Sequence, residues 1–137
     1  MEINKIIARR IYKEIMSEGN LKVIDELLSK NFIDHNLVPG KDTGINEVKK
    51  GFLDFRIAFP DAHANIQDML SDGDKVITRF IWHGTHKGEF MGIEPTGKKV
   101  AVTIIDILLI KNGKVLERWG VEDNLSLWQQ LGVQPKI

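Results

Sequence analysis

Apolar residues in the first part of the chain follow the spacing of amphipathic helices. They recur every three or four positions between Asn4 and Glu18, and Gly19 then stands where a helix would stop. Asn20 is placed as the N-terminal cap of a second, shorter helix, whose apolar positions are Leu21, Ile24, Leu27 and Leu28. These patterns predict two consecutive helices.

A polar break follows at residues 29–44, and helical spacing then returns. A third apolar face runs from Ile45 to Phe59. It ends at Pro60, because proline removes a backbone donor and clashes with the preceding turn. Residues 1–60 are therefore predicted to be helical apart from the break.

From Ala62 onward the apolar period changes to two, which indicates strands. The runs are "AHANIQDML", "KVITRFIWHGTH", "KKVAVTIIDILLIK" and "KVLERWGVE". Asn112-Gly113 separates the last two runs, and this dipeptide is a strong signal for a two-residue hairpin turn. A short final helix is predicted over "DNLSLWQQLG", with Asp123 or Asn124 as its cap.

Helices followed by a meander of strands predict the α+β class, with N-terminal helices packed on one face of a curved antiparallel sheet and a short C-terminal helix. The strand within residues 98–111 is apolar on both faces. One face belongs in the core, so we expect the other to meet a partner subunit and form a homodimer.

Composition narrows the function classes. The 137 residues suit a single domain over 1–137, and acids and bases balance to a formal net charge of zero. No partner such as nucleic acid or an anionic membrane is therefore indicated. Charged residues interrupt the apolar positions of the N-terminal segment at every turn, so it predicts neither a signal peptide nor a membrane span. We expect a cytoplasmic protein.

Two kinds of catalytic site are disfavoured. A metal site would need His83, His86 and Glu89 to converge, but residues three apart on a strand point to opposite faces. Nucleophilic catalysis would need a cysteine or a serine on a sharp strand-to-helix turn, and the chain has no cysteine and no such serine motif. We therefore expect no metal.

Acid/base chemistry by a buried carboxyl group fits better, since burial raises its pKa toward neutrality. Asp106 and Asp123 are the candidates. A two-residue turn at 112–113 pairs residue 106 with 119 and residue 102 with 123, which places Asp106, Trp119 and Asp123 on one face. A bulge at Gly120 would send Asp123 to the other face.

Each candidate also has a structural interpretation. Asp106 is expected as a buried acid neutralised by Arg118 or Arg79, and Asp123 as a simple helix cap. His35 lies in a loop, where both functional and ordinary surface histidines occur. The large aromatic residues are core residues, of which a subset lines a pocket.

Several segments together resemble the SnoaL-like polyketide cyclases, also called ester cyclases. They cover nearly the whole chain in the family's order: "DHN" at 34–36, "FRIAFPD" at 55–61, "DGDKVITRF" at 72–80, "GTHKGEFMGIEPTGKK" at 84–99, "NGKVLERWGVEDNL" at 112–125 and "QQLG" at 129–132.

The resemblance implies a cone-shaped α+β barrel around a pocket, commonly dimeric through the outer face of the sheet. It also implies an intramolecular aldol cyclisation of a hydrophobic carbonyl substrate, without metal or cofactor, in which the aspartate before the last helix is the acid/base. The predicted catalytic residues are Asp123 and His35. The predicted substrate-binding residues are Asn36, Phe55, Phe59, Trp82, His83, His86, Phe90, Asp106 and Trp119.

Two alternatives remain open. In a related epoxide hydrolase of the same fold, two aspartates bridged by an arginine activate water; Asp106 and Asp123 would serve here only if Arg79 or Arg118 reached between them. A non-catalytic module that binds a hydrophobic metabolite would instead have a wholly apolar pocket, with Asp123 turned to solvent or held as a cap.

Overall fold

The computed structural model describes residues 2–36 and 44–133. Its elements, in chain order, are α1 Glu2–Arg10, η1 Ile11–Ser17, α2 Val23–Leu27, β1 Leu28–Asp34, α3 Ile45–Ala58, β2 His63–Asp72, β3 Lys75–Thr85, β4 Lys99–Lys111, β5 Lys114–Glu122 and α4 Asn124–Leu131. No helix in the described ranges is long and apolar enough to cross a membrane.

The N-terminal helix changes its winding half-way along. The predicted helical stretch is confirmed, but after Arg10 it continues as a π-helix, in which the N–H of Glu18 donates to the carbonyl of Lys13 at 3.0 Å. Bonds to the fifth preceding residue widen each turn relative to an α-helix. The residues Ile11, Tyr12, Ile15 and Met16 consequently all line one cavity.

The segment after α2 is a strand, which the sequence analysis did not predict. The polar break was expected from residue 29, whereas Leu28–Asp34 forms β1 and pairs in parallel with β5, opposing Asp34 to Arg118. Leu28, Phe32 and Asp34 are buried in this strand, and the residues between them are not. The prediction failed because a buried aspartate looks like a loop residue until its cationic partner is known.

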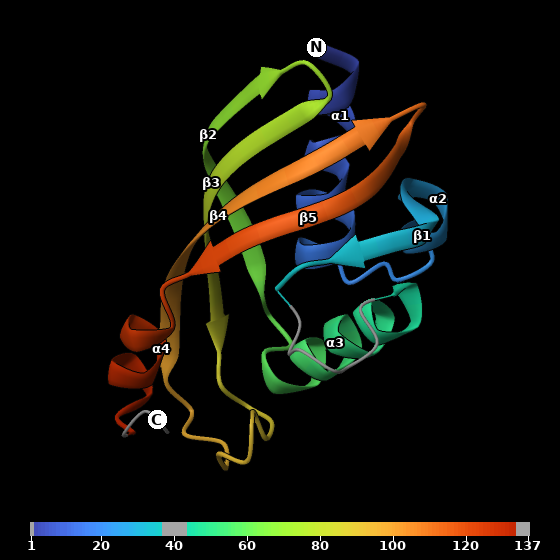
Figure 1. Cartoon of the computed structure of the whole chain (residues 1–137). Coiled ribbons are helices and arrows are strands. Elements are labelled where there is room, and N and C mark those ends of the chain that lie inside the picture. Colours follow the sequence, from blue (N-terminus) through green and yellow to red (C-terminus); the bar gives the residue numbers. More distant parts are fainter. Residues whose placement is uncertain (1, 37–43, 134–137) are drawn as a thin grey trace.

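The five strands form one strongly bent sheet in the order β1-β5-β4-β3-β2. Strands β2 to β5 are an antiparallel meander, and the parallel β1 makes the sheet mixed. Figure 1 shows the sheet curving around α1 and η1, with α3 across its lower side and α4 beside the end of β4. The predicted α+β architecture, with helices against one face of a curved sheet, is confirmed.

The β4–β5 hairpin has the predicted turn but not the predicted register. Lys111 pairs with Lys114 around Asn112-Gly113, and an irregularity between Leu109 and Ile110 then shifts the pairing by one residue. Asp106 therefore opposes Gly120 instead of Trp119. The predicted register is wrong because the bulge lies near the turn, not at Gly120. A one-residue shift exchanges the two faces of a strand.

The two faces of the sheet differ in burial. Along β4 the residues Val100, Val102, Ile104, Asp106 and Leu108 are buried, whereas the alternating residues face outward. Apolar side chains continue on this outer face: Ile105 is 45% exposed and Val121 is 74% exposed. The outer face thus lacks a covering layer within the described chain.

The last helix is fixed at both ends. A carboxylate oxygen of Asp123 accepts a hydrogen bond from the N–H of Ser126 at 3.1 Å, which confirms the predicted cap. The side chain of Gln130 bonds both the N–H and the carbonyl of Ala101, at 2.7 and 2.8 Å. It thereby pairs the edge of β4 beyond the point where β5 ends.

Candidate active site

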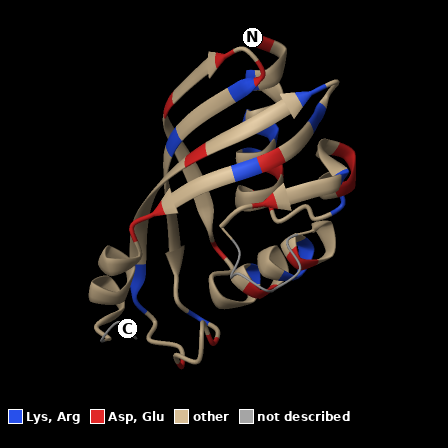
Figure 2. Ribbon diagram, viewed as in Figure 1, with Lys and Arg blue, Asp and Glu red and all other residues tan. Residues whose placement is uncertain are grey.

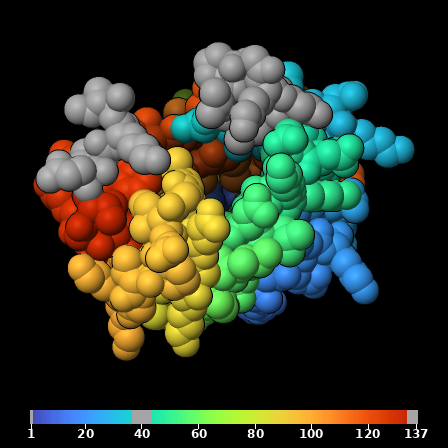
Figure 3. Space-filling model, turned by 90° about the horizontal axis from the view of Figure 1, so that it is seen from below, coloured from blue at the N-terminus to red at the C-terminus, as the bar shows by residue number. Residues whose placement is uncertain are grey.

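A cavity of about 750 Å³ lies between the concave face of the sheet and the helices. Its lining comes from η1, α3, the strands β1, β3, β4 and β5, and the connection that follows β3. In Figure 3 the hollow opens between α3 and the connection from β3 to β4. The lining is mainly apolar, so the charged residues in it need partners.

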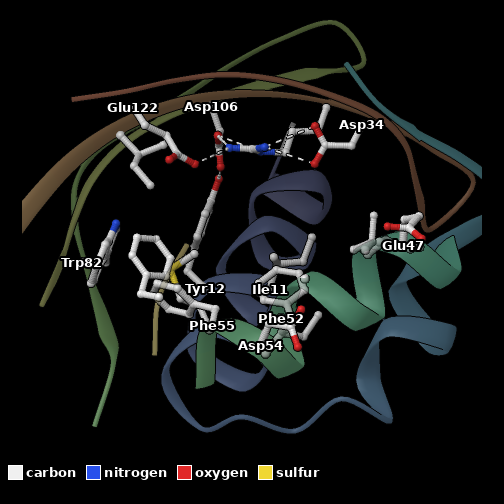
Figure 4. Close-up of a pocket in the computed structure, with 18 of the residues that line it drawn as sticks. Ile11, Tyr12, Asp34, Glu47, Phe52, Asp54, Phe55, Trp82, Asp106 and Glu122 are labelled. Carbon is white, nitrogen blue, oxygen red and sulfur yellow. Dashed lines mark hydrogen bonds and ion pairs between the residues drawn. The ribbon is translucent and has the colours of Figure 1, made fainter. Parts of the chain in front are cut away.

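One arginine, Arg118, binds three of the six carboxyl groups in the described lining, which belong to Asp34, Glu47, Asp54, Glu89, Asp106 and Glu122. The guanidinium of Arg118 on β5 bonds Asp106 on β4 through Nε at 3.0 Å and Nη2 at 2.9 Å, and Asp34 on β1 through Nη1 at 3.1 and 3.2 Å. Nη2 also lies 3.7 Å from Glu122. Figure 4 shows these groups together on the sheet side of the cavity. Charged residues are otherwise sparse along the middle of β4 and β5 (Figure 2).

Asp106 is completely occupied by its neighbours. Its second oxygen accepts a hydrogen bond from the hydroxyl of Tyr12 at 3.0 Å. Burial raises the pKa of the Asp106 carboxyl, while Arg118 and Tyr12 favour its charged form. Burial, together with the charge of Asp106, also raises the pKa of Tyr12 well above its ordinary value. Tyr12 therefore acts as a neutral hydrogen-bond donor to this carboxylate.

Glu122 differs from the other two acids bound to Arg118 because it is accessible. Its side chain lines the cavity, is 39% exposed, and among the described residues has only the longer contact with Arg118. Burial beside the cavity raises the pKa of the Glu122 carboxyl; Arg118 opposes the rise and the charges of Asp106 and Asp34 add to it. Three carboxyl groups around one cation cannot all ionise at low cost. A proton is thus most easily exchanged at Glu122.

Aromatic residues form one wall of the cavity. Trp82 on β3 contacts Phe55 edge-on, with ring centroids 4.8 Å apart, and Phe90 joins them in the lining. Phe59 is fully buried behind this wall, 4.9 Å from Trp82 and 5.2 Å from Phe90 between centroids. Of the predicted pocket residues Phe55, Phe59, Trp82, Phe90 and Trp119, three lie in the lining and Phe59 lies behind them, whereas Trp119 is elsewhere.

Two of the predicted site residues lie on the outer face of the sheet. His35 and Trp119 stack on each other with centroids 4.7 Å apart and an interplanar angle of 6°. The Nε2 of His35 is 2.8 Å from the carboxylate of Glu117. Trp119 opposes Ile107, whose side chain alternates with the buried Asp106. The shifted hairpin register accounts for the position of Trp119, which was expected beside Asp106.

The remaining histidines are separated as their spacing predicted. His83 stacks on His63 across β3 and β2, with centroids 5.1 Å apart. His86 is fully buried and accepts a hydrogen bond at Nδ1 from the N–H of Thr96 at 3.2 Å. Neither lines the cavity.

Asn36 and Asp123 also have structural contacts. The side chain of Asn36 bonds both the carbonyl and the N–H of Gly120, which joins the end of β1 to β5. Asp123 caps α4, is exposed, and is not part of the cavity lining. Its catalytic role stays a prediction. The position it was expected to occupy, beside Asp106, is taken by Glu122, which opposes Ile104.

Sequence reasoning missed Tyr12, Asp34 and Glu122 as site residues. It considered Arg118 as a partner of Asp106 or as a bridge between Asp106 and Asp123. The sequence did contain a signal for Arg118. It lies two residues before Gly120 and so on the same face of the strand, where a glycine leaves room for a large side chain. Asp34 had no local signal, since β1 was not predicted. Glu122 was hidden by the register error.

Comparison with known proteins decides the family. The family model of the SnoaL-like polyketide cyclases matches residues 6–131. The chain belongs to this family. A comparison with curated proteins produced no match.

Solved structures share the fold over nearly the whole chain. TsrD from Streptomyces laurentii is 25% identical, with a TM-score of 0.88 over 97% of each chain. A putative polyketide cyclase from Bacillus cereus is 37% identical, with a TM-score of 0.80 over 94% of this chain and 80% of that one. IdmH, a putative polyketide cyclase from Streptomyces antibioticus, is 30% identical, with a TM-score of 0.79 over 95% and 99%.

We expect Arg118→Met to lower the free energy of unfolding at pH 7 by about 3 kcal/mol, because it leaves buried carboxylates without their cation. Burial already raises the pKa of Asp106, and without the opposing cation it would rise further in the folded variant. The native Asp106 carboxyl then binds a proton before the unfolded one as the pH falls, so the loss should shrink between pH 7 and pH 5. Urea unfolding at both pH values measures this.

The matched control is Arg79→Met, which removes an ion pair with Asp68 whose side chains are 47% and 59% exposed. Exposed ion pairs contribute little to the free energy of unfolding, so Arg79→Met should lower it much less than Arg118→Met. Equal losses for the two variants, or a loss for Arg118→Met that does not change with pH, would contradict the assigned role of Arg118.

Proposed function

We propose that the protein is a cyclase-type enzyme that carries out cofactor-free acid/base chemistry on a small, largely apolar carbonyl compound, with Glu122 as the proton-transferring group. The observation that carries the proposal is an accessible carboxyl group of raised pKa in the lining of an apolar cavity, beside a fixed cation. A general base needs such a pKa and a position within reach of the substrate.

The reaction would proceed without a change of oxidation state. Glu122 takes a proton from the carbon beside a carbonyl group, and the resulting enolate carbon attacks a second carbonyl of the same molecule. The new alkoxide then recovers the proton from Glu122. The total charge of the site is unchanged by each transfer, Arg118 supplies a fixed positive charge beside Glu122, and the cavity walls hold the two carbons close together.

Asp123, the residue implied by the family resemblance, is the competing candidate for the base. However, its carboxylate caps α4 by accepting a hydrogen bond from the N–H of Ser126. A capping Asp123 was also expected for a non-catalytic binding module. That module would have a wholly apolar pocket, however, and the lining here contains Asp34, Asp106, Arg118 and Glu122. The charged array therefore supports an enzyme.

Glu122→Gln and Asp123→Asn separate the two candidates. We expect the native protein to speed deuterium exchange at the benzylic carbon of 2-tetralone in D2O, measured by proton NMR. Glu122→Gln should reduce the catalysed rate at least tenfold, whereas Asp123→Asn, which keeps a capping oxygen, should retain most of it.

The rate should also fall as the pH drops through the raised pKa of Glu122, since a base must be ionised to accept a proton. Loss of activity in Asp123→Asn alone would instead assign the base to Asp123. No exchange above the buffer rate with native protein would contradict the enolisation chemistry.

A second candidate function is epoxide hydrolysis, which one observation favours. Arg118 bridges two aspartates as that reaction requires, although the second is Asp34 and not Asp123. One aspartate would take a proton from a water molecule while the oxygen of that water attacks the epoxide carbon. The other aspartate, in its protonated form, would donate a proton to the epoxide oxygen as the C–O bond breaks.

For this candidate, styrene oxide in ¹⁸O-labelled water should yield a diol with one labelled oxygen. Asp34→Asn and Asp106→Asn should abolish diol formation, and Glu122→Gln should leave it. Mass spectrometry of the product distinguishes these outcomes. A diol yield equal to that measured without protein would contradict epoxide hydrolysis as the function.

We also propose a homodimer through the outer face of the sheet. The support is the contiguous apolar surface of β4 and β5, where Ile105 and Val121 remain exposed in the single chain. Burying this surface against a second copy would remove it from water.

Val121→Glu should convert the dimer to a monomer, because it places a charge in the apolar contact. Leu53→Glu is the control, since Leu53 is 50% exposed but lies on α3, away from the sheet. Sedimentation at micromolar concentration measures both. A native protein that sediments only as a monomer contradicts the dimer.

A further inference from the structure

The indole of Trp82 is rigidly held at the cavity wall. Trp82 is only 3% exposed, and its ring is fixed by edge-on contacts with Phe55 and Phe59 at 4.8 and 4.9 Å between centroids. Its place on β3, opposite Val102, directs it to the concave side of the sheet. A ring held this way has a fixed direction for its N–H.

This N–H has no hydrogen-bond partner among the described residues. The side-chain polar atoms that are sealed from solvent without a partner there are Thr78 Oγ1 and His86 Nε2, so the nitrogen of Trp82 is unpaired but not sealed. Trp82 is one of the residues that line the cavity. Figure 4 shows the nitrogen on the edge of the ring turned toward the side where Glu122 lies.

The other side chains of the described lining that carry permanent donors are already used. Arg118 is shared among three carboxyl groups, and the hydroxyl of Tyr12 donates to Asp106. A buried donor that lacks a partner is unfavourable, so a group that enters the cavity gains by accepting this bond. The unpaired N–H thus selects for an acceptor oxygen on the ligand.

The surrounding charges restrict the ligand further. The described lining contains the carboxyl groups of Asp34, Glu47, Asp54, Glu89, Asp106 and Glu122 but only one cation, Arg118, which three of them occupy. A ligand carboxylate would meet like charges and no free cation. A neutral carbonyl oxygen meets neither problem.

We infer that Trp82 is the donor that recognises a neutral carbonyl oxygen of the substrate and stabilises the enolate formed there. This rests on the proposed function for the enolate step, but the recognition of a neutral carbonyl does not depend on it. When Glu122 removes the adjacent proton, negative charge develops on the oxygen, and the bond from the Trp82 N–H becomes stronger.

A pair of ligands tests the recognition directly. 2-Tetralone and tetralin share a bicyclic skeleton and differ in the carbonyl group. In ¹⁵N-labelled native protein, 2-tetralone should shift the indole proton of Trp82 downfield, and tetralin should not. The chain has three tryptophans, so Trp82→Phe, Trp119→Phe and Trp128→Phe assign the indole signals.

Trp82→Phe should weaken binding of 2-tetralone about five- to tenfold, the effect of one hydrogen bond, and leave tetralin within about twofold. Trp119→Phe, the same change on the outer face, should alter neither affinity. Equal weakening of both ligands would mean that Trp82 only packs, and an indole signal that does not respond to the ketone overturns the inference.

Exchange kinetics separate this inference from the proposed function. Suppose that Glu122→Gln abolishes exchange, and that Trp82→Phe lowers it without changing the ratio of the affinities for the two ligands. The proposed enzymatic function is then supported and the hydrogen bond from Trp82 to the carbonyl is contradicted. If 2-tetralone selectively shifts the Trp82 signal but no exchange occurs, the hydrogen bond is supported and the enzymatic function is contradicted.

Discussion

The buried guanidinium of Arg118 holds the functional half of the molecule together. It bonds carboxylates from two other strands, Asp34 on β1 and Asp106 on β4, and through Asp106 it is connected to Tyr12 on η1. A charge taken out of water this far is tolerable only when good geometry and several hydrogen bonds compensate it. The edge strand β1, the central hairpin and the N-terminal helix are therefore tied at one point.

The same ion pair explains a glycine in the middle of a strand. A Cβ at Gly120 would lie 2.5 Å from a carboxylate oxygen of Asp106 and 2.6 Å from Arg118, so a side chain there would displace the pair. Sequence reasoning interpreted Gly120 as a possible bulge, but the strand pairing at this residue is regular. Glycine is present because two charged side chains cross directly over the backbone.

The array also separates the roles of the carboxyl groups. Asp34 and Asp106 are held by short bonds on the sheet side of the cavity, which suits them to keep Arg118 in place. Glu122 touches the cation only at 3.7 Å and remains accessible from the cavity. The surroundings of each carboxyl group, not its residue type, thus make Asp34 and Asp106 structural partners of Arg118 and suit Glu122 to carry a proton.

The sequence alone determined the fold class, the main helical segments, the strands β2 to β5, the hairpin turn, Asp123 as one of two candidate caps, and the family, because local periodicity and specific motifs carry that information. Only the tertiary structure decided which acid faces the cavity. One shifted residue in the β4–β5 hairpin exchanges the faces of β5, placing Glu122 inside and Trp119 outside. The strand β1 and its Asp34 depend on Arg118, which lies 84 residues away along the chain. Side-chain pairing over that separation leaves no mark in the local pattern, so it becomes visible only when the chain is folded.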